Sequence, residues 1–118
     1  MTGHVSWNLQ LTVQEGQLED ARSLMAEMVS ATTDETGAMG YEWFLSADGA
    51  VLHIHEQYVD SAAALEHLGN FGANFAERFM NCFAPTAFWV YGEPSAEVRG
   101  VLDGFGAVYL GPIGGFRR

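Results

Sequence analysis

The sequence has no lysine and only five arginines among its 118 residues, against fifteen acidic side chains. Without lysine the chain cannot form a Schiff base with a carbonyl substrate or supply the lysine of a phosphate-binding loop. Its net charge of −10 repels phosphate groups, so we expect neither nucleic acid nor a membrane surface as a partner.

Cysteine and long apolar runs are also scarce. The single cysteine, Cys82, has no second thiol in the chain for a disulfide, which favours a cytoplasmic protein. The first ten residues lack the basic start and apolar run of a secretory signal, and no apolar stretch reaches the roughly 18 residues that a membrane-spanning helix needs. With 48% apolar residues, a chain of this length is expected to fold as one domain.

Two periodic segments open the chain. Apolar side chains occupy every second position of residues 5–13, which predicts a strand with one apolar face that carries Trp7 and Leu9. Over residues 16–34 the apolar positions recur at helical spacing instead, so we expect an amphipathic helix that ends near Gly37.

A β-hairpin is predicted next, for residues 40–59. Two runs rich in aromatic and β-branched residues flank Asp48-Gly49, a pair typical of tight turns. In the second run, alternation places Leu52, Ile54, Glu56 and Tyr58 on one face and His53, His55 and Gln57 on the other. One carboxylate, that of Glu56, is therefore expected on an apolar face.

A second helical region should begin after Asp60, which is a good N-cap residue. We expect Gly69 and Gly72 to interrupt or bend it, because glycine is a poor helix former. Three phenylalanines spaced four apart are expected to share one face of this helix: Phe71, Phe75 and Phe79. Pro85 is expected to end the helix, and residues 86–91 predict the next strand.

The order of these elements, β-α-β-β-α-β, predicts an α+β fold of the ferredoxin-like, split βαβ type, with an antiparallel sheet that carries both helices on one face. Residues 1–92 would form this domain. Residues 93–118 predict a short helix and a short edge strand at 108–110, packed on the same domain or on a partner subunit. Because aromatic residues crowd the strands, we expect the other sheet face to be covered by a second copy in a homodimer.

With this order in place, residues 55–75 resemble the antibiotic biosynthesis monooxygenase (ABM) family of small dimeric α/β-barrel proteins. The family pattern has a glutamate, an aromatic residue, an acidic helix start, an alanine and a histidine. Its counterparts in this sequence are Glu56, Tyr58, Asp60, Ala63 and His67. Upstream, the segment GAMGYEWF at residues 37–44 resembles the glycine and aromatic residues with which the family's second strand begins.

The resemblance implies a ligand cleft between the sheet and the helices of each subunit, and a barrel at the dimer centre. Residues expected to line the cleft are Trp7, Leu9, Tyr41, Trp43, Ile54, His67, Phe71 and Phe75. The function implied is a monooxygenase without a cofactor or a metal, acting on a hydrophobic aromatic or quinol-type small molecule. The alternative is a dimeric binding or scaffold module of the same fold that catalyses no reaction.

Two residues are candidates for catalysis, His67 and Glu56. His67 is expected to act as a base or hydrogen-bond partner for a phenolic hydroxyl, or else to pack at a helix edge. Glu56, on an apolar face, would either pair with Arg22 or Arg78 or handle a proton.

The remaining polar candidates lie on the other sheet face. His53 and His55 point the same way, as metal ligands must, but their expected neighbours Asn8 and Gln10 are poor ligands, so we assign the histidines to the subunit interface. Haem-degrading relatives carry an asparagine at the cleft on the first strand. Here Leu9 holds that position and Asn8 faces away, which disfavours haem degradation.

Overall fold

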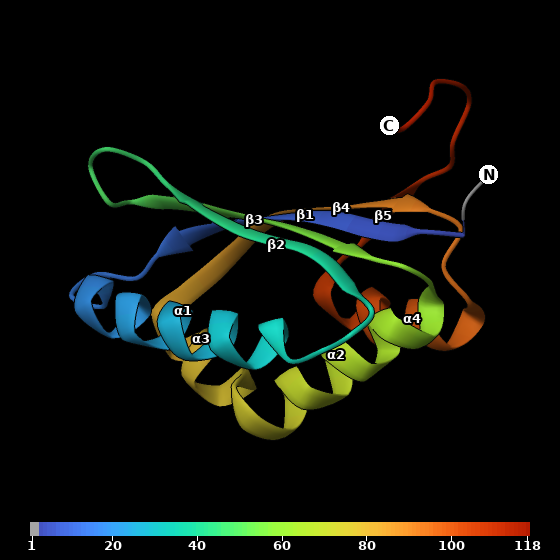
Figure 1. Cartoon of the computed structure of the whole chain (residues 1–118). Helices are drawn as coiled ribbons and strands as arrows, with labels where there is room; N and C mark the ends of the chain where they lie inside the picture. Colours follow the sequence, from blue (N-terminus) through green and yellow to red (C-terminus); the bar gives the residue numbers. More distant parts are fainter. Residues whose placement is uncertain (1–2) are drawn as a thin grey trace.

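A computed structural model describes residues 3–118, which form a five-stranded sheet with helices packed against one of its faces (Figure 1). The first two residues of the expected domain lie outside the described residues. The elements follow in the order β1 (Val5–Val13), α1 (Leu18–Thr33), β2 (Ala38–Leu45), β3 (Val51–Tyr58), α2 (Ser61–Asn74), α3 (Ala76–Cys82), β4 (Phe83–Gly92), α4 (Ala96–Leu102), the 3-10 turn η1 (Asp103–Phe105) and β5 (Val108–Leu110). The predicted α+β, ferredoxin-like fold is confirmed.

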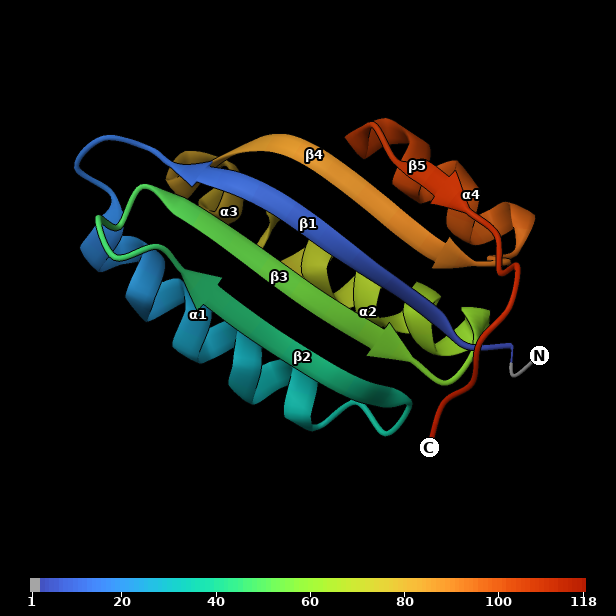
Figure 2. The same cartoon turned by 90° about the horizontal axis from the view of Figure 1, so that it is seen from above.

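The sheet has the strand order β2-β3-β1-β4-β5 (Figure 2). All neighbouring strands are antiparallel except β4 and β5, which run parallel. In the register of β1 against β3, Trp7 lies opposite Glu56 and Leu9 opposite Ile54. Trp7, Ile54 and Glu56 are buried and alternate with positions that are more exposed, so the apolar face of both strands points to the helices, as the alternation predicts.

The helix after β3 differs from the prediction. Asp60 caps it as expected, accepting the Ala63 N–H at 2.8 Å. The helix then runs unbroken through Gly69 and Gly72, whose surroundings are open on the solvent side. It breaks at Phe75 instead, where φ of −131° and ψ of −18° separate α2 from α3. Phe71 and Phe79 therefore lie in two different helices, with Phe75 between them, although Phe71 and Phe75 both pack against the same hydrophobic cluster.

The helical region also ends earlier in the chain than Pro85, where its end was predicted. Helix α3 ends at Cys82, and β4 begins at Phe83 rather than at residue 86. Pro85 lies inside β4, opposite Leu11, next to a shift in the register with β1. A proline is tolerated in a strand at such an irregularity because it has no N–H to donate to the ladder.

The C-terminal segment packs on the same chain. The Ser95 hydroxyl caps α4 by accepting the Val98 N–H at 3.3 Å. Val98 and Leu102 are fully buried against residues of β1 and β4. The edge strand β5 pairs in parallel with β4 of its own chain.

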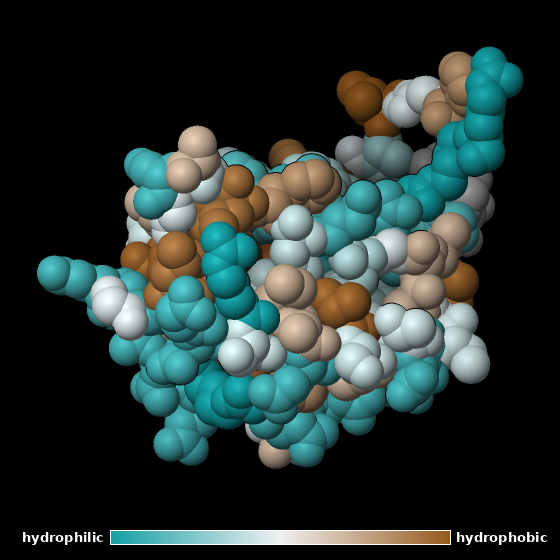
Figure 3. Space-filling view, turned by 60° about the vertical axis from the view of Figure 1, so that its left-hand side comes forward, coloured by the Kyte–Doolittle hydropathy of each residue, from teal (hydrophilic) through white to brown (hydrophobic). Residues whose placement is uncertain are grey.

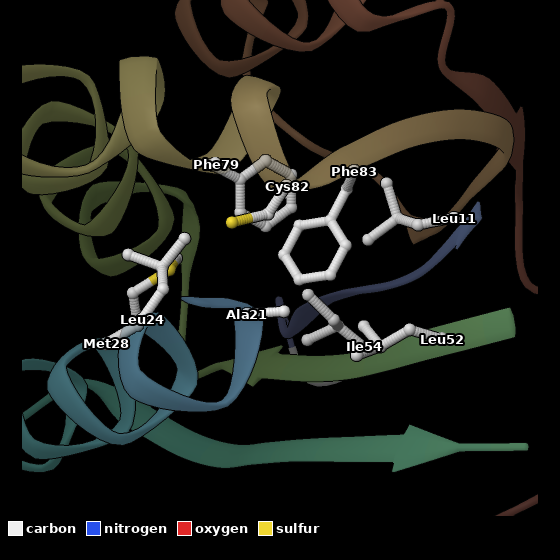
Figure 4. Packing of buried hydrophobic residues seen from close by; sticks show 9 residues of the cluster. All are labelled: Leu11, Ala21, Leu24, Met28, Leu52, Ile54, Phe79, Cys82 and Phe83. Atoms are coloured by element: carbon white, nitrogen blue, oxygen red, sulfur yellow. The ribbon is translucent and has the colours of Figure 1, made fainter. Parts of the chain in front are cut away.

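Two hydrophobic clusters fill the space between the sheet and the helices. The first, shown in Figure 4, joins α1 and α3 to the end of β1 and the beginnings of β3 and β4. It consists of Leu11, Ala21, Leu24, Met28, Leu52, Ile54, Phe79, Cys82 and Phe83. The second lies under α2 and α4: Val5, Trp7, Tyr58, Ala64, Phe88, Val90, Val98 and Leu102. None of the helices in residues 3–118 is long and apolar enough to cross a membrane.

Candidate active site

A pocket lies between the two hydrophobic clusters, under the helix-facing side of the sheet. Its lining is apolar except for three side chains, Tyr41, Glu56 and His67. The cavity itself measures about 50 Å³, and counted out to its mouth it measures about 530 Å³. Polar groups that face such an apolar space are held away from water, where hydrogen bonds and charges act most strongly.

Glu56 stands at the centre of the polar lining. It is 5% exposed and projects from β3 toward the helices. Its Oε1 atom accepts a hydrogen bond from the Tyr58 hydroxyl at 2.6 Å and lies 3.2 Å from Nε2 of His67. Its second oxygen, Oε2, accepts no hydrogen bond from any residue of the described chain. Glu56 lines the pocket, so its carboxylate borders the space that a ligand would fill.

His67 connects Glu56 to a second buried carboxylate. Its Nδ1 lies 3.0 Å from Oε1 of Glu35, which is 8% exposed. The other oxygen of Glu35 accepts a hydrogen bond from the Asn70 amide at 3.2 Å. A neutral imidazole has one N–H only, whereas a ring facing carboxylates on both sides has two acceptors to satisfy. The geometry therefore favours an imidazolium at His67.

The electrostatic balance agrees with this protonation state. Burial lowers the pKa of His67, but the hydrogen bonds and charges of Glu56 and Glu35 outweigh it, so the pKa is raised. A protonated ring cannot act as a base. Both ring nitrogens of His67 therefore serve as hydrogen-bond donors to the two carboxylates of Glu35 and Glu56.

Two tyrosines complete the site. Burial and the charge of Glu56 raise the pKa of both Tyr41 and Tyr58 far above the usual range, so both keep their protons. The Tyr58 hydroxyl is used by Glu56, as described above. The buried hydroxyl of Tyr41 makes no hydrogen bond that meets the usual geometric limits, although Thr32 and Trp43 lie near it. A ligand in the pocket could satisfy this group.

Most of the residues predicted to line the cleft do line the pocket: Trp7, Leu9, Tyr41, Ile54, His67 and Phe71. Trp43 and Phe75 do not. Trp43 lies two residues after Tyr41 in β2, and its ring packs against the rings of Phe79 and Phe83. Phe75 lies at the break between α2 and α3, partly buried against the first hydrophobic cluster.

The expected arginine partner of Glu56 is wrong. Arg78 lies on the surface, where its guanidinium forms two hydrogen bonds with the carboxylate of Glu27, at 3.0 and 2.6 Å. Arg22 is exposed on α1. Glu56 is paired with the imidazolium and a tyrosine instead.

The two histidines of the hairpin lie away from the pocket, on the face of the sheet that no helix covers. The Asn8 amide is 2.6 Å from Nε2 of His55, as expected for its neighbour on the first strand. Within residues 3–118, no three side chains among His, Cys, Asp and Glu are grouped so that they could hold a metal ion.

The model of the family "Antibiotic biosynthesis monooxygenase" matches residues 5–74, which is more than half of the chain. The chain belongs to this family. No curated protein sequence matches it.

Three solved structures share the fold of this chain. MupZ from Pseudomonas fluorescens has a TM-score of 0.88 and 23% identity, with all of this chain and 91% of that chain covered. SnoaB, a cofactor-independent oxygenase from Streptomyces nogalater, has a TM-score of 0.66 and 14% identity, with 80% and 96% covered. Rv0793 from Mycobacterium tuberculosis has a TM-score of 0.59 and 26% identity, with 78% and 96% covered. The likeness to MupZ therefore extends over the C-terminal segment, which the ABM family match leaves out.

Proposed function

We propose that this ABM protein is a cofactor-independent monooxygenase that binds a flat hydrophobic aromatic or quinol-type molecule in the pocket. The observation that carries the proposal is the buried Glu56–His67 pair, set in a lining that is otherwise apolar apart from Tyr41. Membership of a family named for monooxygenases and the fold shared with a cofactor-independent oxygenase support the type of reaction.

The proposed chemistry starts with a proton transfer. The phenolic hydroxyl of the substrate donates to Oε2 of Glu56, in the way that the Tyr58 hydroxyl already donates to Oε1. The imidazolium of His67 holds the carboxylate in place and offsets the negative charge of the substrate anion in the apolar pocket. The aromatic ring of the substrate anion then supplies the electrons for O₂, while the apolar lining of the pocket excludes water.

Oxygen consumption tests this proposal. Protein mixed with 1,4-dihydroxynaphthalene should accelerate oxygen uptake above the rate in buffer. Glu56→Gln should lower the accelerated rate by about 100-fold, the lower end of what a positioned proton-transfer group contributes. Glu27→Gln, on the surface beside Arg78, is the matched control and should leave the rate unchanged. Uptake that is equal in Glu56→Gln and wild type would remove Glu56 from the reaction.

A second candidate is a binding module of the same fold without turnover. It is favoured by the fact that both ring nitrogens of His67 and Oε1 of Glu56 already have partners in the chain. Calorimetric binding of the naphthalene diol, together with no acceleration of oxygen uptake, would decide for this candidate.

We further propose that the protein is a cytoplasmic homodimer joined through the sheet face that the helices leave uncovered. Exposed aromatic residues on that face, Phe44, Trp89 and Tyr91, support this contact. The histidines His53 and His55 would then belong to the interface.

A further inference from the structure

Part of the pocket wall comes from the C-terminal segment, outside the residues that match the ABM family. Leu102 of α4 and Phe105 of η1 both line the pocket, although the family match ends at residue 74. Leu102 is fully buried, whereas the Phe105 side chain is 38% exposed. This segment therefore supplies both a fixed part of the wall and a part that reaches the surface.

The backbone below Phe105 is anchored on both sides. Gly106, with φ of 77°, closes η1 by donating its N–H to the carbonyl of Asp103 at 3.1 Å. The Tyr109 hydroxyl, in β5, donates to the Asp103 carboxylate at 2.6 Å. The Arg99 guanidinium of α4 lies over the Tyr109 ring at 4.2 Å. These contacts hold the backbone on either side of Phe105 in place.

The Phe105 ring meets the pocket through Phe71. Their ring centroids are 6.3 Å apart at an angle of 70°, and this is the one aromatic contact of Phe105 among the residues that the structure describes. Phe71 itself packs on the buried ring of Phe79 at 5.2 Å. Phe105 is thus the outermost ring of a row that leads from the surface into the core.

The size of the cavity makes a movable side chain necessary. An apolar cavity of about 150 Å³ accepts benzene, and the cavity here measures about 50 Å³. Among the large apolar side chains that line the pocket, those of Met80 and Phe105 are the most exposed, at 44% and 38%. Methionine adapts to many shapes, whereas a phenyl ring is rigid, so Phe105 is the better discriminator of size.

We propose that Phe105 is the gate of the pocket and sets the size of the flat apolar molecule that enters. This inference rests on the proposed function for the kind of ligand, and it adds the residue that selects among such ligands. The gate opens when the ring turns away from Phe71 toward solvent, and the ligand then occupies the space between Phe71 and the Glu56–His67 pair.

Binding of two phenols of different size tests the gate. Affinities for 1-naphthol and 2-hydroxyanthracene are measured by calorimetry under nitrogen, and association rates are followed by stopped-flow fluorescence. Phe105→Ala should raise the affinity for the three-ring phenol about tenfold relative to the two-ring phenol, since a few methylene equivalents in a pocket have effects of this size. Phe105→Trp should shift the ratio the other way and slow association of both.

Two control variants separate the gate from a general loosening of the segment. Val101→Ala, on the exposed side of α4 away from the pocket lining, should leave the ratio unchanged. Glu97→Gln, exposed in the first turn of α4 and outside the pocket lining, should leave both affinities and their ratio unchanged. A thermal melt of each variant checks that the fold is intact.

The outcomes distinguish the gate from the proposed function. Binding of both phenols to wild type, with the same affinity ratio in all Phe105 variants, would overturn the gate alone. Binding of 1-naphthol only after Phe105→Ala would support the gate. Absence of binding in wild type and in Phe105→Ala would overturn the gate and the proposed ligand class together.

Discussion

At the scale of single residues, Glu35 is a charged residue of the site that was not predicted from the sequence. An acidic residue just after a helix is usually solvated, and nothing in its immediate neighbours marks it as buried. A signal was nevertheless present. The buried residues Met28 and Thr32 are followed by Glu35 at a spacing of four and then three, so the carboxylate continues the inward stripe of α1.

The charge state of His67 depends on Glu35. We expect Glu35→Gln to lower the pKa of His67, because one of the two carboxylates that favour the imidazolium becomes a neutral amide. The ring C–H resonances of His67, followed by NMR against pH, measure this change. Glu27→Gln should leave the His67 titration unchanged, since its side chain lies on the surface. An unchanged pKa in Glu35→Gln would show that this contact does not control the charge.

The same pair predicts how stability varies with pH. The pKa of His67 in the folded state is raised above its unfolded value of about 6.5. Protonated His67 therefore stabilises the folded state fully below about pH 6.5, and this contribution to the free energy of unfolding is lost as the pH rises through the folded-state pKa. The groups that face the ring, Glu56, Glu35, Tyr41 and Tyr58, include two carboxylates and no other cation. Urea unfolding of wild type and His67→Gln from pH 5.5 to 9 should therefore show a difference that shrinks as pH rises. A difference that is constant or grows would contradict the assignment.

At the scale of the elements, Gly37 fixes the distance between Glu35 and His67. This glycine lies between α1 and β2, and its carbonyl accepts the Val59 N–H at 2.9 Å. A Cβ atom added there would lie 2.4 Å from the Cβ of Ala63 in α2, which is closer than real contacts allow. The absence of a side chain therefore lets the loop that carries Glu35 rest directly on the helix that carries His67.

Gly37→Ala should destabilise the protein by about 2 kcal/mol, because overpacking of a tight contact costs in this range. It should also lower the pKa of His67 by moving Glu35 away. Gly69→Ala is the matched control. A Cβ atom added at Gly69 in α2 would have no neighbouring atom within 4 Å, so the higher helix propensity of alanine should stabilise the protein by up to about 1 kcal/mol. Urea unfolding and the NMR titration report the two effects. Equal stability of the two variants would show that the loop can shift at no cost.

The alternation of apolar residues was sufficient to predict strands β1 and β3 and the face on which each of their side chains lies, because one buried face fixes register. It placed Glu56 inward and His55 outward, as observed. The break at Phe75 could not be predicted, because no glycine or proline occurs at residues 73–77 to mark it. Glycine and proline were given too much weight as signals for the ends of helices. Helix α2 continues through the exposed Gly69, where an added Cβ atom would have nothing within 4 Å, and Pro85 lies within β4 at an irregularity of the strand.

At the scale of the whole molecule, the uncovered face of the sheet carries apolar side chains that a soluble monomer would rarely expose. Exposed by a third or more on this face are Phe44, Val51, Trp89, Tyr91, Val108 and Leu110. In Figure 3 the lower, helical side is mostly hydrophilic, and hydrophobic side chains gather in the upper part. The C-terminal residues stand above the same face, with Ile113 and Phe116 exposed and Arg117 donating to the Gln57 side chain at 3.2 Å (Figure 1).

The proposed dimer can be tested at the centre of this face. Trp89 lies opposite Asn8 and beside Val108, so an arginine in its place would bring an unpaired charge into a sheet-to-sheet contact. We expect Trp89→Arg to weaken the dimer by about 2 kcal/mol or more, roughly a thirtyfold rise in Kd, as for a central aromatic residue of an interface. Val101→Arg adds the same charge to the exposed side of α4 and should leave Kd unchanged. Sedimentation velocity across a dilution series measures both variants, and a wild-type chain that remains monomeric at high concentration would remove the second copy from this face.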